Sequence, residues 1–115
     1  MRNIARWDRD FQVWAYSVSY SQLLLRSLGD ESPARVDVLF SNVRLMHLVP
    51  EMSTLSIDMA DGRSFRGFEM PQLAKGNWYV INDGESYVFA THCQWHEDEG
   101  SHGSPSHFGP LRGTP

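Results

Sequence analysis

The segment that most constrains the fold spans residues 77–95, where two runs of β-branched and aromatic residues flank the dipeptide Asp83-Gly84. Asp-Gly between alternating runs is a strong hairpin signal, because a tight reversal of the chain needs backbone with positive φ. The sequence therefore predicts a β-hairpin. Its second arm alternates between a polar and an apolar side, and we expect the apolar side to face the core. That side carries Tyr87, Phe89, Thr91, Cys93 and Trp95.

Other segments show strand-like alternation and are separated by turn residues. They span residues 11–20, 22–28, 35–40, 43–48, 54–60 and 64–70. Asp61-Gly62 is a second turn signal, and Gly67 indicates a bulge in the last of these segments. The pattern predicts an all-β or mostly β fold. We expect about seven strands in a single antiparallel sheet that curls into a small barrel, roll or sandwich, with closure favoured because it removes exposed edges.

The N-terminal residues 1–10 have weak helical periodicity, because Ile4, Trp7 and Phe11 fall near one helical stripe. They predict a short helical turn. An irregular arm that packs Trp7 onto the rest of the protein would explain the same residues and stays open as an alternative.

The chain of 115 residues is long enough to bury one hydrophobic core without a disulfide or a structural metal. Residues 1–96 are predicted to form a single β-rich domain. From residue 97 the composition shifts to Gly, Ser, Pro and His with few core-forming side chains. Residues 97–115 are therefore predicted to form a flexible tail.

The cysteine and charge content narrow the class of protein. The single cysteine, Cys93, excludes an internal disulfide, which fits a reducing compartment, and we expect a cytoplasmic protein. No segment approaches the roughly 20 apolar residues that cross a bilayer, so no membrane association is expected. The net charge is −4 and the basic residues are scattered, which argues against nucleic-acid binding because that function needs a basic patch.

Four histidines near the C-terminus are candidate metal ligands. His92, His96, His102 and His107 lie beside a run of acidic residues, and imidazole and carboxylate groups suit zinc or a similar divalent metal. On an extended strand His92 and His96 would lie about 13 Å apart, so a shared ion requires a bend after Gln94. Solvated polar residues at a strand end and in the tail are the favoured interpretation of the same residues, and no other cofactor is expected.

The sequence contains none of the familiar catalytic motifs, such as a phosphate-binding loop or a nucleophile elbow. Cys93 and His92 are neighbours, but consecutive side chains of a strand point to opposite faces, so they cannot act together as nucleophile and base. A buried, unreactive thiol is the expected state of Cys93. These observations favour a binding protein over an enzyme, and no catalytic residue is assigned.

An aromatic stripe is the candidate binding surface. Trp14, Tyr16, Val18 and Tyr20 fall on one side of the strand predicted over residues 11–20. Trp and Tyr combine apolar area with a hydrogen-bonding tip, which suits ligand pockets and partner surfaces. Trp14, Tyr16 and Tyr20 are therefore the predicted ligand-binding or partner-binding residues, with burial in the core as the alternative.

Taken together, these features indicate a small cytoplasmic β-rich binding module that contacts a protein partner or a small ligand. Formation of a homodimer through an exposed strand edge is a further expectation. Two alternatives stay open. One is a metal-binding protein or metal-dependent hydrolase that uses the C-terminal histidines, and the other is a structural subunit of a larger complex.

Overall fold

The computed structural model describes residues 1–28, 34–60, 64–71, 74–98, 106 and 108. Within them the protein is all-β with antiparallel pairing, as the sequence predicts. The first sheet, sheet A, has the strand order β1-β7-β10-β11-β5. Its strands are β1 (Arg2–Trp7), β5 (Leu45–His47), β7 (Leu55–Ala60), β10 (Asn77–Ile81) and β11 (Ser86–Ala90).

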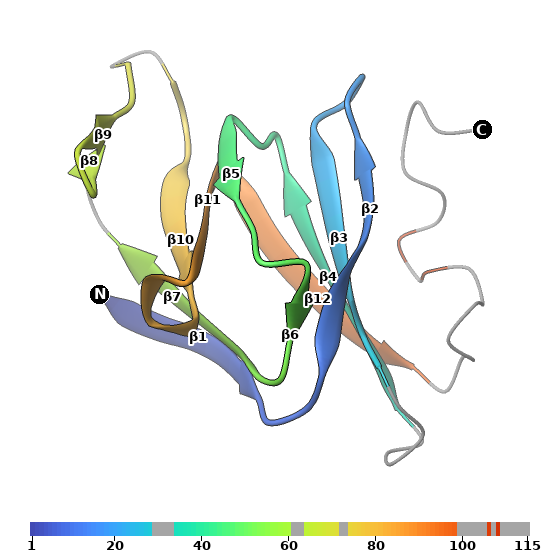
Figure 1. The fold of residues 1–115 in the computed structure, drawn as a ribbon. Helices are drawn as coiled ribbons and strands as arrows, with labels where there is room; N and C mark the ends of the chain where they lie inside the picture. The colour runs from blue at the N-terminus through green and yellow to red at the C-terminus, as the bar shows by residue number, and fades with distance from the viewer. Residues whose placement is uncertain (29–33, 61–63, 72–73, 99–105, 107, 109–115) are drawn as a thin grey trace.

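The second sheet, sheet B, has the strand order β12-β4-β3-β2-β6, and a two-stranded hairpin stands apart from both sheets. The strands of sheet B are β2 (Phe11–Ser17), β3 (Gln22–Ser27), β4 (Arg35–Ser41), β6 (Glu51–Met52) and β12 (His92–Asp98). The hairpin consists of β8 (Ser64–Phe65) and β9 (Phe68–Glu69). Sheets A and B face each other, with the hairpin beyond sheet A (Figure 1).

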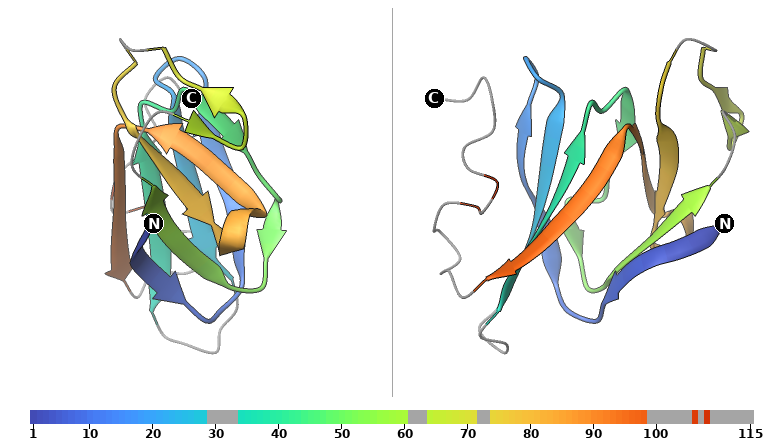
Figure 2. Two further views of the ribbon diagram at one scale, coloured as in Figure 1. Left: turned by 90° about the vertical axis from the view of Figure 1, so that its left-hand side faces the viewer. Right: turned by 180° about the vertical axis from the view of Figure 1, so that it is seen from behind.

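The prediction of one curled sheet is wrong, because the described strands form two facing sheets and a separate hairpin and do not close into a barrel. The chain changes sheet instead of curling one. Strands β1 and β11 belong to sheet A, whereas β2 and β12, which follow them, belong to sheet B, and two further views show these crossings (Figure 2). Two packed layers give a short chain a buried core without closing its edges.

The main core lies between the two sheets, and alternate residues along most strands point into it. Its buried members are Phe11, Leu23, Leu25, Val36, Val38, Phe40, Val43, Met52, Leu55, Ile57, Tyr79, Ile81, Val88 and Ala90. Both sheets contribute, so neither can be stable with its inner face exposed.

The hairpin predicted around Asp83-Gly84 is confirmed, because β10 pairs with β11 in continuous register. Its turn is longer than the two-residue form that Asp-Gly suggests. Residues 82–85 form the loop, and Asn82, Asp83 and Gly84 all have positive φ. The Asn82 side chain ties this loop to the start of β7, since it accepts a hydrogen bond from Ser56 N–H (2.9 Å) and donates one to the Thr54 carbonyl (2.8 Å).

The second arm of this hairpin is not one strand. Strand β11 ends at Ala90 and β12 begins at His92 in the other sheet. The expected core face is also different, because Val88 and Ala90 face the main core whereas Tyr87 and Phe89 belong to a cluster on the outer face of sheet A. Both faces of β11 are buried, and alternation cannot identify the inner face of such a strand.

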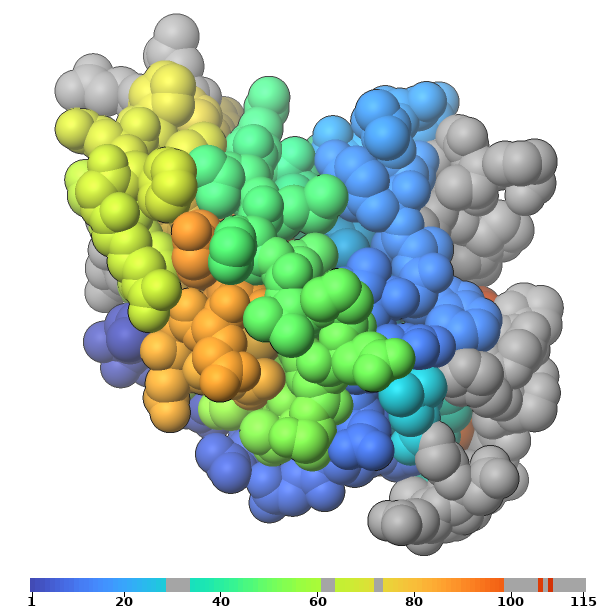
Figure 3. All heavy atoms as spheres, viewed as in Figure 1, coloured from blue at the N-terminus to red at the C-terminus, as the bar shows by residue number. Residues whose placement is uncertain are grey.

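The outer cluster of sheet A is aromatic and is covered by the β8–β9 hairpin. Its buried members are Ala60, Trp78, Val80, Tyr87 and Phe89, with Phe65 of the hairpin packed against them. The expected bulge at Gly67 is instead the tip of the hairpin, where Arg66 and Gly67 both have positive φ. In the space-filling view this hairpin lies against β5 and the β10–β11 loop (Figure 3). The Arg66 guanidinium lies over the rings of Phe65 and Tyr87.

The two ends of the chain also differ from expectation. Residues 2–7 form strand β1 on the edge of sheet A, so the predicted N-terminal helical turn is wrong. Strand β12 continues to Asp98, two residues into the segment predicted as a tail. Of the remaining tail the structure describes Ser106 and Phe108, and Phe108 packs against Leu24 and Leu39 on the outer face of sheet B.

Asp61-Gly62, the second predicted turn, lies outside the described residues. Among the residues that are described, no helix has the length and apolar character needed to cross a membrane.

Candidate functional site

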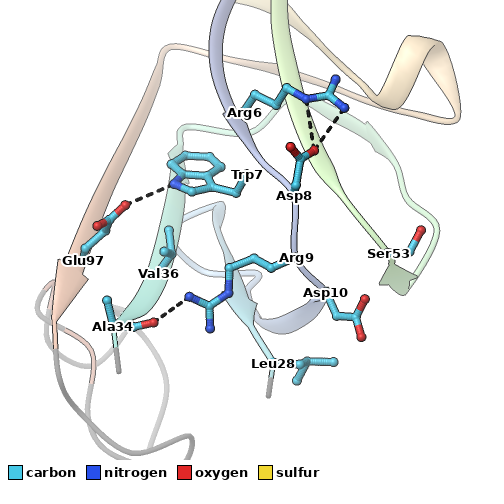
Figure 4. Close-up of a pocket in the computed structure, with 10 residues that line it drawn as sticks. All are labelled: Arg6, Trp7, Asp8, Arg9, Asp10, Leu28, Ala34, Val36, Ser53 and Glu97. Carbon is cyan, nitrogen blue, oxygen red and sulfur yellow. Dashed lines mark hydrogen bonds and ion pairs between the residues drawn. The ribbon is translucent and has the colours of Figure 1, made fainter. Parts of the chain in front are cut away.

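A pocket of about 720 Å³ lies at the end of the sandwich where β1 turns into β2. Figure 4 shows its lining. The lining residues are Arg6, Trp7, Asp8, Arg9, Asp10, Leu28, Ala34, Val36, Ser53 and Glu97. They come from segments that are far apart in the sequence, so this site exists only after the two sheets have packed.

The end of β1 and the β1–β2 connection together supply half of this lining, and neighbouring strands hold them in place. The backbone N–H of Leu28 donates to the Asp10 carbonyl (2.8 Å), which fixes the connection to the end of β3. The Thr54 hydroxyl donates to the Trp7 carbonyl (3.0 Å), which fixes it to the start of β7. Two backbone carbonyls of the pocket wall, those of Trp7 and Asp10, are therefore already paired.

Most cationic and donor groups of the pocket already have partners within the protein. Arg6 Nε donates to Asp8 Oδ1 (3.1 Å), and Arg9 Nη1 donates to the carbonyl of Ala34 (2.6 Å). The indole Nε1 of Trp7 donates to Glu97 Oε1 (3.2 Å), which joins the edge strand of sheet A to that of sheet B (Figure 4). These bonds orient the two arginines and the indole before any ligand arrives.

Two smaller depressions, of about 370 and 340 Å³, adjoin this pocket, and Ser53 lines all three. Their combined lining is acidic, with only Arg6 and Arg9 as basic residues. The carboxylates are Asp8, Asp10, Glu51, Asp83, Glu85 and Glu97. Within the described part of the chain Asp8 is the one among them that forms an ion pair. This end of the molecule therefore carries a negative field.

The structure does not bring Trp14, Tyr16 and Tyr20 together. A β-bulge at Trp14 shifts the register of β2 against β3 between Val13 and Ala15, and it reverses the alternation beyond that point. Tyr16 packs against the main core. Trp14 lies on the outer face of sheet B, where the Arg26 guanidinium is 4.6 Å from the ring centroid, and Tyr20 lies in the β2–β3 turn. The prediction that these aromatic side chains share one face of a strand is therefore wrong.

The predicted metal ligands are only partly described. His92 and His96 lie along β12, where His92 Nδ1 is 2.9 Å from the Thr91 hydroxyl and His96 is opposite Asp37 of β4. His102 and His107 lie outside the described residues. The part of the chain that the structure describes contains no group of three or more His, Cys, Asp or Glu side chains able to hold a metal. The four-histidine site stays a prediction.

Cys93 packs against the main core from β12. Burial raises the pKa of its thiol to about 12, so the thiol is protonated and weakly nucleophilic at neutral pH. Burial also raises the pKa of Tyr79, partly offset by a hydrogen bond with Asn77. The thiol thus matches the unreactive state expected from the sequence.

A buried ion-pair network on the outer face of sheet B was not anticipated. The Arg26 guanidinium donates two hydrogen bonds to the Asp37 carboxylate, Nε to Oδ1 at 2.8 Å and Nη2 to Oδ2 at 3.1 Å. Both side chains are only 2% exposed. Arg35 Nη2 bonds Asp98 Oδ2 at 3.0 Å and its Nε is 4.0 Å from Asp37 Oδ2. A sequence signal existed, because Arg26 directly follows three leucines and Asp37 lies between two valines.

The pocket residues were also missed, although Arg6-Trp7-Asp8-Arg9-Asp10 is a dense run of charges around one indole. No family model, no curated protein and no solved structure matches this chain. The function is therefore inferred from the residues themselves.

Proposed function

We propose that this chain is a binding module whose acidic end, the three adjoining depressions around Ser53, binds a small ligand that carries an amine or guanidinium group. The observation that carries this proposal is the charge of the lining, six carboxylates against two arginines. A cationic ligand gains from that field, and an anionic ligand is repelled by it.

The size of the pocket supports the same proposal. Small-molecule sites usually enclose about 300–1,000 Å³, and the main pocket falls within that range at about 720 Å³. Its walls are more polar than those of most such sites, which suits a polar ligand. Trp7 adds an aromatic ring among the carboxylates, and a ring face attracts a cation independently of formal charge.

The two arginines offset only part of the acidic field, because six carboxylates line the three depressions. Arg6 is paired with Asp8, and the Arg9 guanidinium is directed at the Ala34 carbonyl. Asp10 and Glu51 line the same adjoining depression as Ser53, and they are the carboxylates that we expect to meet the ligand cation.

The alternatives drawn from the sequence, a metal-dependent protein and a structural subunit, stay predictions. The cytoplasm stays the proposed compartment, because the one cysteine is a partly buried, protonated thiol that needs no oxidising environment.

An NMR titration of ¹⁵N-labelled protein with arginine amide tests the proposal, with glutarate as the anionic counterpart. We expect saturable shifts of the Trp7 indole N–H and of the Asp10 and Ser53 amides with arginine amide, and none with glutarate. Raising the salt concentration should weaken binding, because exposed charges are screened.

Asp10→Asn should weaken binding of arginine amide about threefold, the usual worth of one exposed charge pair. Glu69→Gln is the matched control, because it removes the same charge from an exposed position on β9. Equal effects of the two variants, or shifts spread evenly over the surface, would reject the acidic end as the binding site.

A further inference from the structure

The four edges of sheets A and B are not equally protected. An edge strand exposes unpaired N–H and C=O groups, and proteins usually shorten, bend or charge such strands. Edge strand β5 has three residues and β6 has two. Edge strand β1 carries Arg2 and Arg6 and has a register shift between Asn3 and Ala5. These three edges are therefore poor templates for another strand.

Edge strand β12 is neither short nor bent, and its acidic residues, Glu97 and Asp98, lie together at one end of the strand. It is seven residues long, contains no Lys, Pro or Gly, and pairs with β4 in unbroken register from His92 to Asp98. No other strand lies beyond it in either view of Figure 2. Among the described edge strands it is the longest, and it is the long one whose pairing has no register shift.

The sequence of β12 is complementary to itself when two copies run antiparallel. The only register that pairs all seven residues places Trp95 opposite Trp95. It then places His92 opposite Asp98 and Gln94 opposite His96, each twice. Opposite charge and hydrogen-bonding pairs stabilise neighbouring strands, and like charges directly opposite destabilise them.

The remaining pair in this register is Cys93 with Glu97. Glu97 accepts the hydrogen bond from Trp7 Nε1, and Cys93 is a neutral thiol at neutral pH because burial raises its pKa to about 12. No like-charged pair therefore arises on the inner face of the extended sheet.

The Trp95 side chain is exposed enough to take part in a contact with a second copy. Its ring packs edge-on against Trp7 at 5.6 Å between centroids, yet 41% of the residue is exposed at the strand edge. An indole from a second copy would cover this surface and add an aromatic cross-strand pair.

We propose that two copies of this chain pair antiparallel through β12, with Trp95 on the two-fold axis, so that the two copies of sheet B become one continuous sheet. The interface is isologous and closed, since each copy uses the same strand once. It does not depend on what the acidic end binds.

Sedimentation velocity of the full chain, from low micromolar to millimolar concentration, provides the first test. We expect a concentration-dependent monomer–dimer equilibrium. His92→Asp places a carboxylate opposite Asp98 at two symmetric positions and should weaken the dimer about tenfold. His92→Asn is the matched neutral control and should leave the equilibrium within about twofold of the parent chain. A chain that stays monomeric throughout would overturn the proposal.

Disulfide trapping tests the register itself and does not depend on the stability of any charge variant. In a Cys93→Ala background, Gln94→Cys and His96→Cys are purified separately and then mixed under mild oxidation. We expect rapid formation of the mixed disulfide, because these positions face each other, and slow self-linkage of either variant alone. Self-linkage as fast as mixed linkage, or linkage no faster than with Glu69→Cys on β9, would overturn the proposal.

Discussion

Sheets A and B both bury much of their outer face, but sheet A does so under an aromatic hairpin and sheet B around a network of ion pairs. On sheet A, the ring centroid of Phe65 is 5.5 Å from that of Trp78 and 5.3 Å from that of Tyr87. On sheet B, Arg26 and Asp37 are buried together beneath Trp14. Apolar packing is non-directional and tolerates change, whereas a buried ion pair depends on the presence of both partners.

This difference predicts that the two faces respond differently to the loss of one side chain. The apolar face should lose stability in proportion to the contact area removed. The charged face should lose much more when one partner is removed than when both are removed, because a lone buried charge pays its full desolvation cost.

Asp37→Ala is expected to have the largest effect, a loss of about 3–5 kcal/mol in the free energy of unfolding, because it leaves Arg26 buried without its carboxylate. Urea denaturation followed by circular dichroism measures this loss. The double variant Arg26→Met, Asp37→Leu should be less destabilised than Asp37→Ala alone. A double variant as unstable as the single one would show that shape, and not charge, sets the penalty on sheet B.

Phe65→Ala is expected to cost about 2 kcal/mol, because it removes a partly buried ring from the cluster without leaving a charge behind. The emission of Trp78, which is fully buried, should shift to longer wavelength as water reaches the cluster. Phe68→Ala is the control, since Phe68 is 43% exposed and contacts Tyr87 at 6.0 Å. A smaller loss for Phe65→Ala than for Phe68→Ala would mean that the hairpin does not cover sheet A through Phe65.

The smallest expected effect is a fall in stability at alkaline pH caused by Cys93, which lies in β12 just after the chain crosses from sheet A to sheet B. Its pKa is about 12 in the folded protein against an ordinary 9.0. Between these values the unfolded chain releases a proton that the folded chain keeps, so stability falls as the pH rises above about 9. By about pH 10 we expect a loss on the order of 1 kcal/mol relative to Cys93→Ala. Parallel stability curves for the two proteins at alkaline pH would contradict a buried thiol.

The comparison of the two faces also explains which strands could be predicted. The segments 35–40 and 55–60 were recognised because period-two alternation and the surrounding turn residues are local signals. The orientation of β11 was not, because both of its faces are buried and alternation then carries no information. In β4 the alternation does identify the inner face, but it does not predict that Asp37 on the outer face is as buried as its apolar neighbours.

The N-terminal strand and the bulge at Trp14 show a second limit. Strand β1 exists because β7 pairs with it from far along the chain, whereas its own sequence has the spacing of a weak helix. Tertiary pairing overrides such propensities. The bulge then separates Trp14 from Tyr16, and one extra residue is enough to move a side chain to the opposite face.

By itself the sequence determined that the chain is β-rich, that its strands are antiparallel, and that a hairpin forms around Asp83-Gly84, because alternation and turn chemistry act between near neighbours. Only the tertiary structure decided that two sheets face each other, that Arg26 meets Asp37, and that six carboxylates gather at one end. These contacts join residues distant in sequence, and their partners are chosen by packing of the whole core.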